Sequence, residues 1–463
     1  MKKKLLMALG SAIGAGVLFA NIPNAYAWTL QQAAAPYKGE TITIVGLDRP
    51  SYQAAQKLTP IFEKETGIHV HWVIYPYGET LKAEMLNFIS HSQEYDVVLS
   101  DCVWPVTFAK GGWVVPVQHF LDNPKLRDPA YDLKGFFPIW LSAFTVHGTL
   151  EGIPFDSYSG LLYYNKSMFK KAGIQHPPAT WQELREDAQK LTNKKEGVYG
   201  YALQSARGET QTADAFARFL WPWGGRFLNI KTHKILVNDP QSVKGIEFRD
   251  SMLKYMPPGI VADNHPQVVE FLAQKRVAMI TEWSAFDVTL KKALGSDLGV
   301  APEPRGPKGA FSAFGGFAYM ISDQVPQKEQ NAAWLFVQWL TSAKMANPLT
   351  NLGAVTARKA TDANPALDTK FPDLKVMAYT WEHQSVPNWR PQLACYPRFS
   401  TIVSYWGSTI ELGRVPVQEG LNKMADKLST YMKATKCWAT ANDPDKYVPI
   451  YKKWEASSET KLP

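Results

Sequence analysis

The chain lacks most of the short motifs on which catalysis and metal binding depend. It has three cysteines and nine histidines in 463 residues, and neither Cys-x-x-Cys nor His-Glu-x-x-His occurs in it. Gly-x-Ser-x-Gly and glycine-rich phosphate loops are missing as well. We therefore expect no catalytic residue, no metal and no cofactor. A carbohydrate-active enzyme, which would use a pair of carboxylates, is the disfavoured alternative.

Long apolar runs and runs of basic charge are also scarce. The one long apolar run, residues 5–20, is broken by glycines and is shorter than the roughly 20 residues of a membrane-spanning helix. No five consecutive Lys or Arg residues occur, although the formal net charge is +8. We interpret the charge as a solvated exterior and expect no nucleic-acid partner.

The first residues have the order of a secretory signal peptide. Lysines at positions 2–4 precede the apolar run, and Ala25-Tyr26-Ala27 supplies the small residues of a cleavage site. We expect residues 1–27 to be removed. Trp28 stands where a lipoprotein would carry a cysteine, so the expected product is a soluble monomer in the periplasm.

Cysteine usage fits an exported protein with a single disulfide. Cys395 and Cys437 lie in the same C-terminal stretch and make a better pair than either makes with Cys102. Cys102 would then be a buried, unreactive thiol.

Strand and helix patterns alternate in the first hundred residues. Strands are expected at 41–45, 68–74 and 95–100, and helices at 52–66, ending before Gly67, and at 79–90. This order predicts a mainly parallel sheet with helices on both faces, in which ligands lie beyond the carboxyl ends of the strands.

Later segments add helices but no repeat. A helix at 180–190 has Thr180 as N-cap and Glu183 three residues on, and others are expected at 242–256 and 331–341. The length of the chain favours two domains, and no low-complexity linker separates them. Two lobes joined by several crossings fit this pattern.

Several segments together resemble one family, the cluster of extracellular solute-binding proteins known as family 1, which includes maltose, trehalose and polyol binders. The segments, in order, are FEKETGIHV at 62–70, DVV at 96–98 with Asp101, GIPFDS at 152–157, LYYNK at 162–166, FKKAGI at 169–174, PPATWQEL at 177–184, VAM at 277–279, EWS at 282–284, GGF at 315–317, WLFVQWLTS at 334–342, and RP at 390–391 with YP at 396–397.

The resemblance implies a fold, a function and a partner. It implies two α/β lobes, each a mainly parallel sheet flanked by helices, around a ligand cleft. Residues 28–150 and 306–358 would form the first lobe, 151–305 the second, and 359–463 a mainly helical part of the second. The protein would bind a sugar, oligosaccharide or polyol and deliver it to the membrane permease of an ABC importer.

The candidate ligand-binding residues follow from sugar chemistry together with this resemblance. Sugar pockets need flat aromatic surfaces, with carboxylates and Arg as hydrogen-bonding partners. Trp283, the glycine pair and Arg390 stand where relatives contact ligand, and the others are aromatic or charged residues near strand ends and turns. The candidates are Asp48, Arg49, Tyr52, Asp101, Trp104, Asp156, Tyr158, Trp221, Trp223, Trp283, Gly315, Gly316 and Arg390.

Other ligands on the same fold remain open. The adjacent Tyr163 and Tyr164 are of the kind that holds ferric ion in iron-binding relatives, although here they read as part of a strand. A polyamine or a glycerophosphodiester also suits a mixture of carboxylates and aromatics. Neither the particular sugar nor the role of residues 437–463 follows from the sequence.

Overall fold

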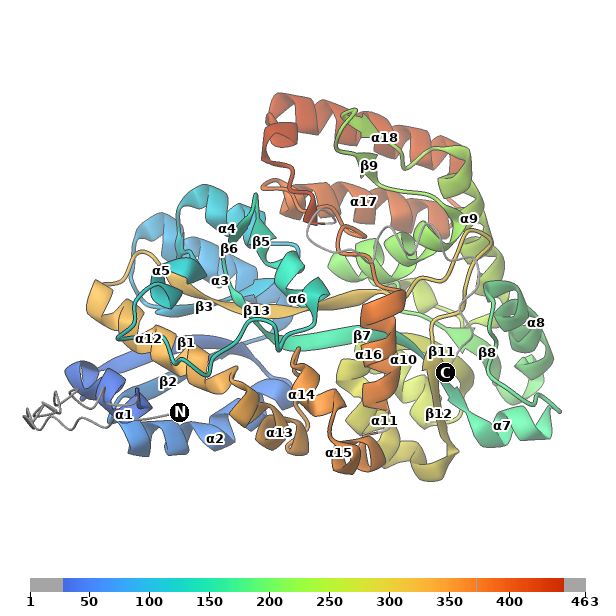
Figure 1. Ribbon diagram of the computed structural model, residues 1–463. Helices are drawn as coiled ribbons and strands as arrows, with labels where there is room; N and C mark the ends of the chain where they lie inside the picture. Colours follow the sequence, from blue (N-terminus) through green and yellow to red (C-terminus); the bar gives the residue numbers. More distant parts are fainter. Residues whose placement is uncertain (1–27, 372, 445–463) are drawn as a thin grey trace, which may run out of the picture.

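The computed structural model describes residues 28–371 and 373–444 (Figure 1). The expected signal peptide, residues 1–27, and most of the C-terminal residues 437–463 therefore lie outside the described residues. The strands are β1 (Thr41–Leu47), β2 (His69–Tyr75), β3 (Val97–Asp101), β4 (Val114–Val115), β5 (Thr145–Val146), β6 (Thr149–Leu150), β7 (Ile153–Asn165), β8 (Tyr199–Ala202), β9 (Leu228–Asn229), β10 (Lys234–Ile235), β11 (Val277–Trp283), β12 (Leu298–Pro302) and β13 (Phe314–Ser322).

Two halves of one sheet share a long central strand. The order is β2-β1-β3-β13-β7-β11-β8, with β12 on β7 and β4 on β13. Pairings β1–β2, β1–β3 and β8–β11 are parallel, whereas β7 and β13 run antiparallel to their neighbours. The first half of β7 pairs with β13 and its second half with β11 and β12, so β7 crosses from one lobe to the other.

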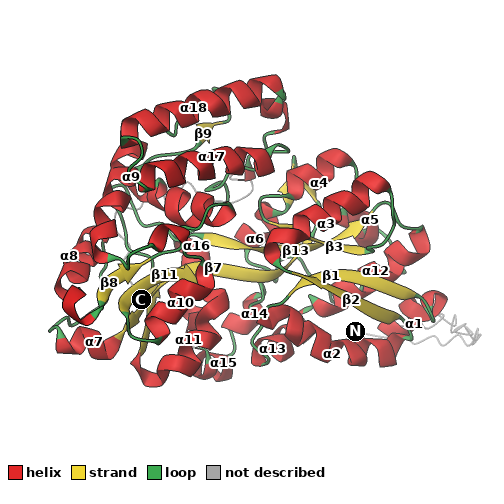
Figure 2. Cartoon of the chain, turned by 180° about the vertical axis from the view of Figure 1, so that it is seen from behind, coloured by secondary structure: helices red, strands yellow, loops and turns green. Residues whose placement is uncertain are grey.

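Helices cover both faces of the sheet (Figures 1 and 2). In the first lobe, α2 and α13 lie on one side and α3 and α4 on the other. The α-helices are α1 (Leu30–Ala34), α2 (Pro50–Thr66), α3 (Tyr77–Ser90), α4 (Pro105–Gly111), α5 (Val117–Leu121), α6 (Pro138–Ala143), α7 (Lys166–Lys171), α8 (Trp181–Leu191), α9 (Pro240–Met252), α10 (His265–Ala273), α11 (Asp287–Leu294), α12 (Gln327–Leu340), α13 (Ala343–Asn351), α14 (Lys359–Asp362), α15 (Pro365–Lys370), α16 (Asp373–His383), α17 (Tyr396–Glu411) and α18 (Val417–Ala434).

Local sequence signals set the ends of these helices. Gly67 ends α2 with φ +73°, a left-handed conformation that glycine adopts without strain. Thr180 caps α8, since its Oγ1 accepts a hydrogen bond from the Glu183 amide at 3.1 Å. The Glu183 carboxylate accepts a bond from the Ala179 amide in return. Because α9 ends at Met252 and a 3-10 turn follows, that helix is shorter than expected.

The C-terminal segment connects the two lobes. Helices α17 and α18 pack on α9 and on the π-helix η3 (Gln211–Phe216), which belong to the second lobe. The expected disulfide between Cys395 and Cys437 is present, with a Cα–Cα distance of 5.9 Å. Beside it, Asn442 and Gln392 donate hydrogen bonds to backbone carbonyls of the first lobe, at Thr145 and Cys102.

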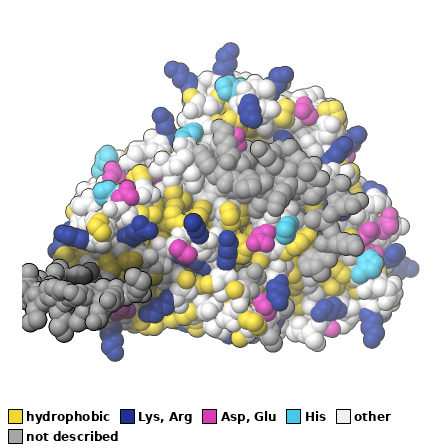
Figure 3. Space-filling view, in the orientation of Figure 1, with side chains coloured by type: hydrophobic (Ala, Val, Ile, Leu, Met, Phe, Trp, Pro, Cys, Tyr) yellow, Lys and Arg dark blue, Asp and Glu magenta, His cyan; other side chains and the backbone are white. Residues whose placement is uncertain are grey.

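On the face shown in Figure 3, Lys and Arg side chains are scattered singly among acidic and uncharged ones, and they are most numerous along the upper edge. Within residues 28–371 and 373–444, no helix has the length and apolar character needed to cross a membrane.

Candidate functional site

A cleft of about 530 Å³, its open mouth included, lies between the two lobes. Strand ends from both halves of the sheet supply its walls, as the topology rule for α/β sheets requires. The lining residues are Arg49, Tyr77, Asp101, Tyr158, Glu209, Thr210, Ala213, Asp214, His265, Trp283, Ala285, Phe286, Gly315, Gly316, Phe317 and Arg390.

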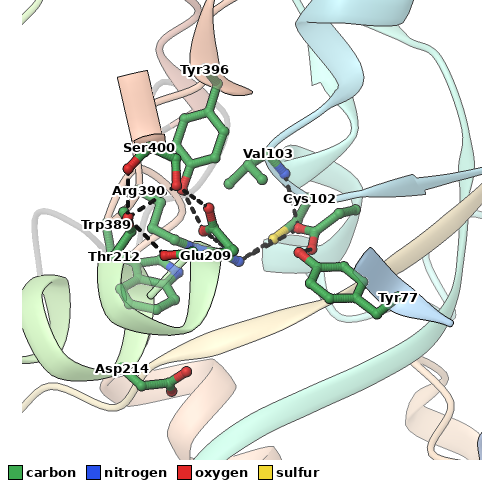
Figure 4. Close-up of polar contacts among 12 residues, drawn as sticks. Tyr77, Cys102, Val103, Glu209, Thr212, Asp214, Trp389, Arg390, Tyr396 and Ser400 are labelled. Carbon is green, nitrogen blue, oxygen red and sulfur yellow. Dashed lines mark hydrogen bonds and ion pairs between the residues drawn. The ribbon is translucent and has the colours of Figure 1, made fainter. Parts of the chain in front are cut away.

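Arg390 is the centre of an ion-pair cluster that joins the lobes (Figure 4). Its Nη1 donates to Glu209 of the second lobe at 2.7 Å, and its Nη2 lies 3.6 Å from Asp101 at the end of β3. Nη2 also donates to Cys102 Sγ at 3.1 Å. The side chain is only 4% exposed, so these contacts are shielded from water and strengthened.

Both carboxylates of this cluster have further partners. Asp101 accepts a hydrogen bond from the Tyr77 hydroxyl at 2.8 Å. Glu209 accepts hydrogen bonds from Tyr396 at 2.6 Å and from the Ser400 hydroxyl at 2.5 Å. Burial raises the pKa of Glu209, while the charge of Arg390 acts in the opposite direction.

Arg49 projects into the cleft from the N-cap of α2, directly after β1. Its guanidinium lies 5.3–5.6 Å from the ring centres of Tyr77, Tyr158 and Phe317. Beneath it, the Tyr158 hydroxyl donates to the fully buried Asp156. Burial raises the pKa of Asp156 to about 6, against the charge of Arg49.

Trp283 and the glycine pair form the flat part of the wall. Trp283 ends β11 and is partly exposed to the cleft. A Cβ atom at Gly315 would lie 3.1 Å from the Trp283 ring and 3.4 Å from Arg390. A larger residue at this position would therefore displace the indole ring. The wall therefore offers an apolar plane beside charged hydrogen-bonding groups, which is what a hydroxylated carbon skeleton requires.

A second charged group lies on the second-lobe side of the cleft. Asp214 pairs with buried Arg218 at 2.6 Å, and Arg218 also contacts Glu303 at 2.9 Å. His265 Nδ1 is 2.9 Å from Glu282 Oε1, and its ring stacks on Phe286. Burial lowers the pKa of His265, but Glu282 and Asp214 more than offset this and leave that pKa raised.

Of the thirteen expected ligand-binding residues, the structure brings seven together in the cleft lining: Arg49, Asp101, Tyr158, Trp283, Gly315, Gly316 and Arg390. The other six do not line the cleft. Asp48 is exposed and accepts a hydrogen bond from Gln53. Asp156 lies beneath Tyr158, and Tyr52 is a core residue packed on Phe155.

The three remaining tryptophans pack behind the cleft wall. Trp104 stacks on Tyr77 at 5.9 Å, Trp221 donates its indole N–H to the Trp389 carbonyl, and Trp223 packs on Phe248. All three are at most 8% exposed. Their positions next to turns and acidic residues suggested contact with ligand, but the same positions serve packing.

Sequence reasoning missed several lining residues, chiefly Tyr77, Glu209, Asp214 and His265. Tyr77 follows β2 as Arg49 follows β1, so the rule about carboxyl ends of strands could have found it. Glu209 is 181 positions from Arg390 in sequence, and no local pattern marks it. Asp214 lies in the π-helix η3, a form that short-range propensity does not predict.

The features expected of a metal site are not found in the part of the chain that the structure describes. No group of three or more His, Cys, Asp or Glu residues is arranged to hold a metal ion there. Tyr163 and Tyr164 lie within β7, paired with β11 and β12, and neither lines the cleft.

Two α/β lobes around a cleft of aromatic and charged side chains define the class of two-lobed solute-binding proteins. The chain matches the sequence model described as bacterial extracellular solute-binding protein over residues 47–347, and it belongs to that family. It is thus a solute-binding protein of the kind that serves ABC importers.

Relatives and solved structures agree with this assignment. A Deinococcus radiodurans protein named "Probable ABC transporter-binding protein" is 27% identical over 79% of this chain and 83% of its own length. The mannitol-binding protein of Pseudomonas aeruginosa is 22% identical, covering 65% and 69% of the two chains. An ABC transporter solute-binding protein from Agrobacterium radiobacter K84, solved with ribitol, has a TM-score of 0.77 and 26% identity, covering 85% and 99%.

Proposed function

We propose that this protein captures a polyol or a short saccharide in its interlobe cleft and delivers it to an ABC permease without chemical change. The observation that carries the proposal is the Trp283 face beside the Arg390, Asp101 and Glu209 cluster. An indole plane suits the C–H face of a polyol or sugar ring, and the charged groups suit its hydroxyls. The mannitol-binding relative and the similar structure solved with ribitol support a polyol as ligand.

The seven clustered candidates, from Arg49 to Arg390, are the proposed ligand contacts. Closure of the lobes would bring groups from both of them onto the ligand, because Asp101 belongs to the first lobe and Glu209 and Trp283 to the second. The ligand must bind the closed form better than the open one for closure to follow. The closed form would be the one that the permease accepts, and the receptor would work in the periplasm after removal of residues 1–27.

A thermal-shift screen of residues 28–463 tests the ligand class. The probes are ribitol, mannitol, sorbitol, glucose and maltose, the sugar acids gluconate and glucuronate, and spermidine, glycerophosphocholine and ferric citrate. A probe at a thousandfold over its Kd stabilises the native state by about 4 kcal/mol, enough to raise Tm by several degrees. A shift with at least one polyhydroxylated compound is expected. A shift with spermidine or ferric citrate, and with none of the polyhydroxylated compounds, contradicts the proposal.

A further inference from the structure

The fixed carboxylates of the cleft already have protein partners. Asp101 pairs with Tyr77 and Arg390, and Glu209 with Arg390, Tyr396 and Ser400. Asp214 pairs with Arg218 at 2.6 Å and lies 3.8 Å from His265. Each of these carboxylates therefore has a cationic partner before any ligand enters, with Asp101 and Glu209 sharing Arg390.

Arg49 differs from the other charged residues of the lining. Among the described residues, no carboxylate lies within ion-pair distance of its guanidinium. Its contacts are three aromatic rings and the Tyr158 hydroxyl, with Asp156 acting on it only through its charge. Asp156 is fully buried and accepts a hydrogen bond from the Tyr158 hydroxyl, so its side chain is held below the cleft surface. A guanidinium fork without a carboxylate partner is the preferred recognition group for a carboxylate or a phosphate.

A second basic group faces the same space. His265 lines the cleft with Arg49, but its Nδ1 lies 2.9 Å from Glu282 and its Nε2 lies 3.8 Å from Asp214, so this basic group already has carboxylate partners. The rings of Tyr77, Tyr158 and Phe317 fix Arg49 in the lining, so little side-chain entropy is lost when an anion binds.

We infer that the ligand carries an acidic group on its hydroxylated carbon skeleton, and that Arg49 binds this group. The inference rests on the proposed function and narrows it from neutral polyols and sugars to polyhydroxylated acids. The acidic group would meet Arg49, the hydroxyls would meet the Arg390 cluster, and the carbon skeleton would lie on Trp283. A carboxylate and a phosphate monoester share the required chemistry.

Titration calorimetry with matched compounds tests the inference. The first set is sorbitol, gluconate and sorbitol 6-phosphate, which share a six-carbon skeleton and in which each acid differs from sorbitol at one end, and the second is glucose with glucuronate. We expect at least one acid to bind more than about 10-fold tighter than its neutral counterpart, because hydrogen bonds to a charged group are stronger than those between neutral groups. The tighter of gluconate and sorbitol 6-phosphate identifies the acidic group.

Two variants distinguish a role of Arg49 in binding the acidic group from general effects of a substitution on the protein. Arg49→Gln should weaken binding of the acid about 10- to 100-fold and binding of its neutral counterpart by a clearly smaller factor, so that the preference for the acid is lost. Arg185→Gln is the matched control, because Arg185 stacks on Phe248 at 5.2 Å outside the cleft, and it should change neither. If Arg49→Gln fails to fold, Arg49→Lys, which keeps the charge, should retain the preference for the acid.

The results that overturn the inference are distinct from those that overturn the proposed function. Equal binding of acid and neutral compound, or equal loss of both in Arg49→Gln, overturns the role of Arg49 and leaves a receptor for neutral polyols. Absence of binding by every acid overturns the inference. If the neutral compounds also fail to bind, the proposed function falls with it.

Discussion

At the scale of single residues, Trp283 is the apolar plane of the cleft. It ends β11, stands over Gly315, and lies 6.2 Å from the Trp389 ring at a tilt of 50°. Buried Arg218 lies 5.6 Å from its ring centre. The indole is thus packed against protein groups and remains partly exposed in the cleft lining.

Replacing Trp283 should weaken ligand binding while the fold survives. Trp283→Ala removes the plane on which a carbon skeleton would lie, and we expect about 10- to 100-fold lower affinity, corresponding to about 1.5–3 kcal/mol of lost apolar contact. Calorimetry with the tightest compound of the screen measures this loss. Trp406→Ala, which removes a partly buried tryptophan of α17 outside the cleft, is the control and should leave affinity unchanged. An unfolded Trp283→Ala beside a folded Trp406→Ala would make Trp283 a core residue instead.

The residues of the site were predictable only where a motif or a strand end marks them. Asp101 follows β3 and Arg49 follows β1, so topology alone directs both toward the cleft. Trp104 and Trp223 were predicted as aromatic residues beside an acidic residue or a turn, and they are packed behind the wall. Whether an aromatic ring faces the ligand or the core depends on contacts with segments that are distant in the sequence. The Glu209–Arg390 ion pair also joins distant segments, and local sequence patterns do not predict such contacts.

At the scale of elements, β13 presents its two glycines to opposite sides. Side chains alternate along a strand, so a Cβ at Gly315 would point to the Trp283 ring and one at Gly316 toward β7. There the Gly316 Cβ would lie 2.2 Å from the Asp156 carbonyl oxygen and 3.0 Å from the Trp140 ring. The first glycine shapes the cleft, and the second permits β13 and β7 to pair.

Substitution of the two glycines should therefore have different effects. Gly316→Ala forces backbone atoms apart, and we expect a loss of about 1–3 kcal/mol in the free energy of unfolding, read from denaturant midpoints. Gly315→Ala displaces the Trp283 ring by a few tenths of an ångström, so it should lower affinity with a smaller loss of stability. Equal destabilisation by both, or unchanged affinity in Gly315→Ala, would contradict this division.

Most regular elements of the first lobe could be predicted from sequence. The β-branched runs and Gly67 locate β1, α2 and β2 to within two residues, because local patterning and turn chemistry determine them. The thirteen-residue strand β7 was harder to find. It is buried almost throughout and pairs with different partners along its length, so it shows neither alternation nor an end signal where it crosses between lobes.

At the scale of the whole molecule, the lobes are connected by more than backbone crossings. Strand β7 passes between them, Arg390 bridges Asp101 to Glu209, and the segment fastened by the Cys395–Cys437 disulfide contacts both. Many of these connections are polar and buried. The charge state of buried acids should therefore influence the stability of the whole protein.

Every carboxyl group of the described residues with a resolved shift has a raised pKa, and burial is the leading cause. The pKa of Asp156 rises from 3.8 to about 6, although the charge of Arg49 acts to lower it. The pKa of Glu303 rises from 4.5 to about 7, although the charge of Arg218 acts to lower it. Between about pH 4 and 7 the folded protein thus holds protons that the unfolded chain has released.

Stability should fall as pH rises through this window. The native state binds more protons there, so the free energy of unfolding decreases with pH, and the stabilisation present near pH 4 to 5 is lost as Asp156 and Glu303 ionise near pH 6 and 7. The raised pKa of His265 acts in the same direction. We expect a Tm several degrees higher at pH 5 than at pH 8, measured by calorimetry at constant ionic strength. Glu303→Gln should flatten the slope, and a Tm that rises from pH 5 to 8 would show that these acids are ionised at little cost in the folded protein.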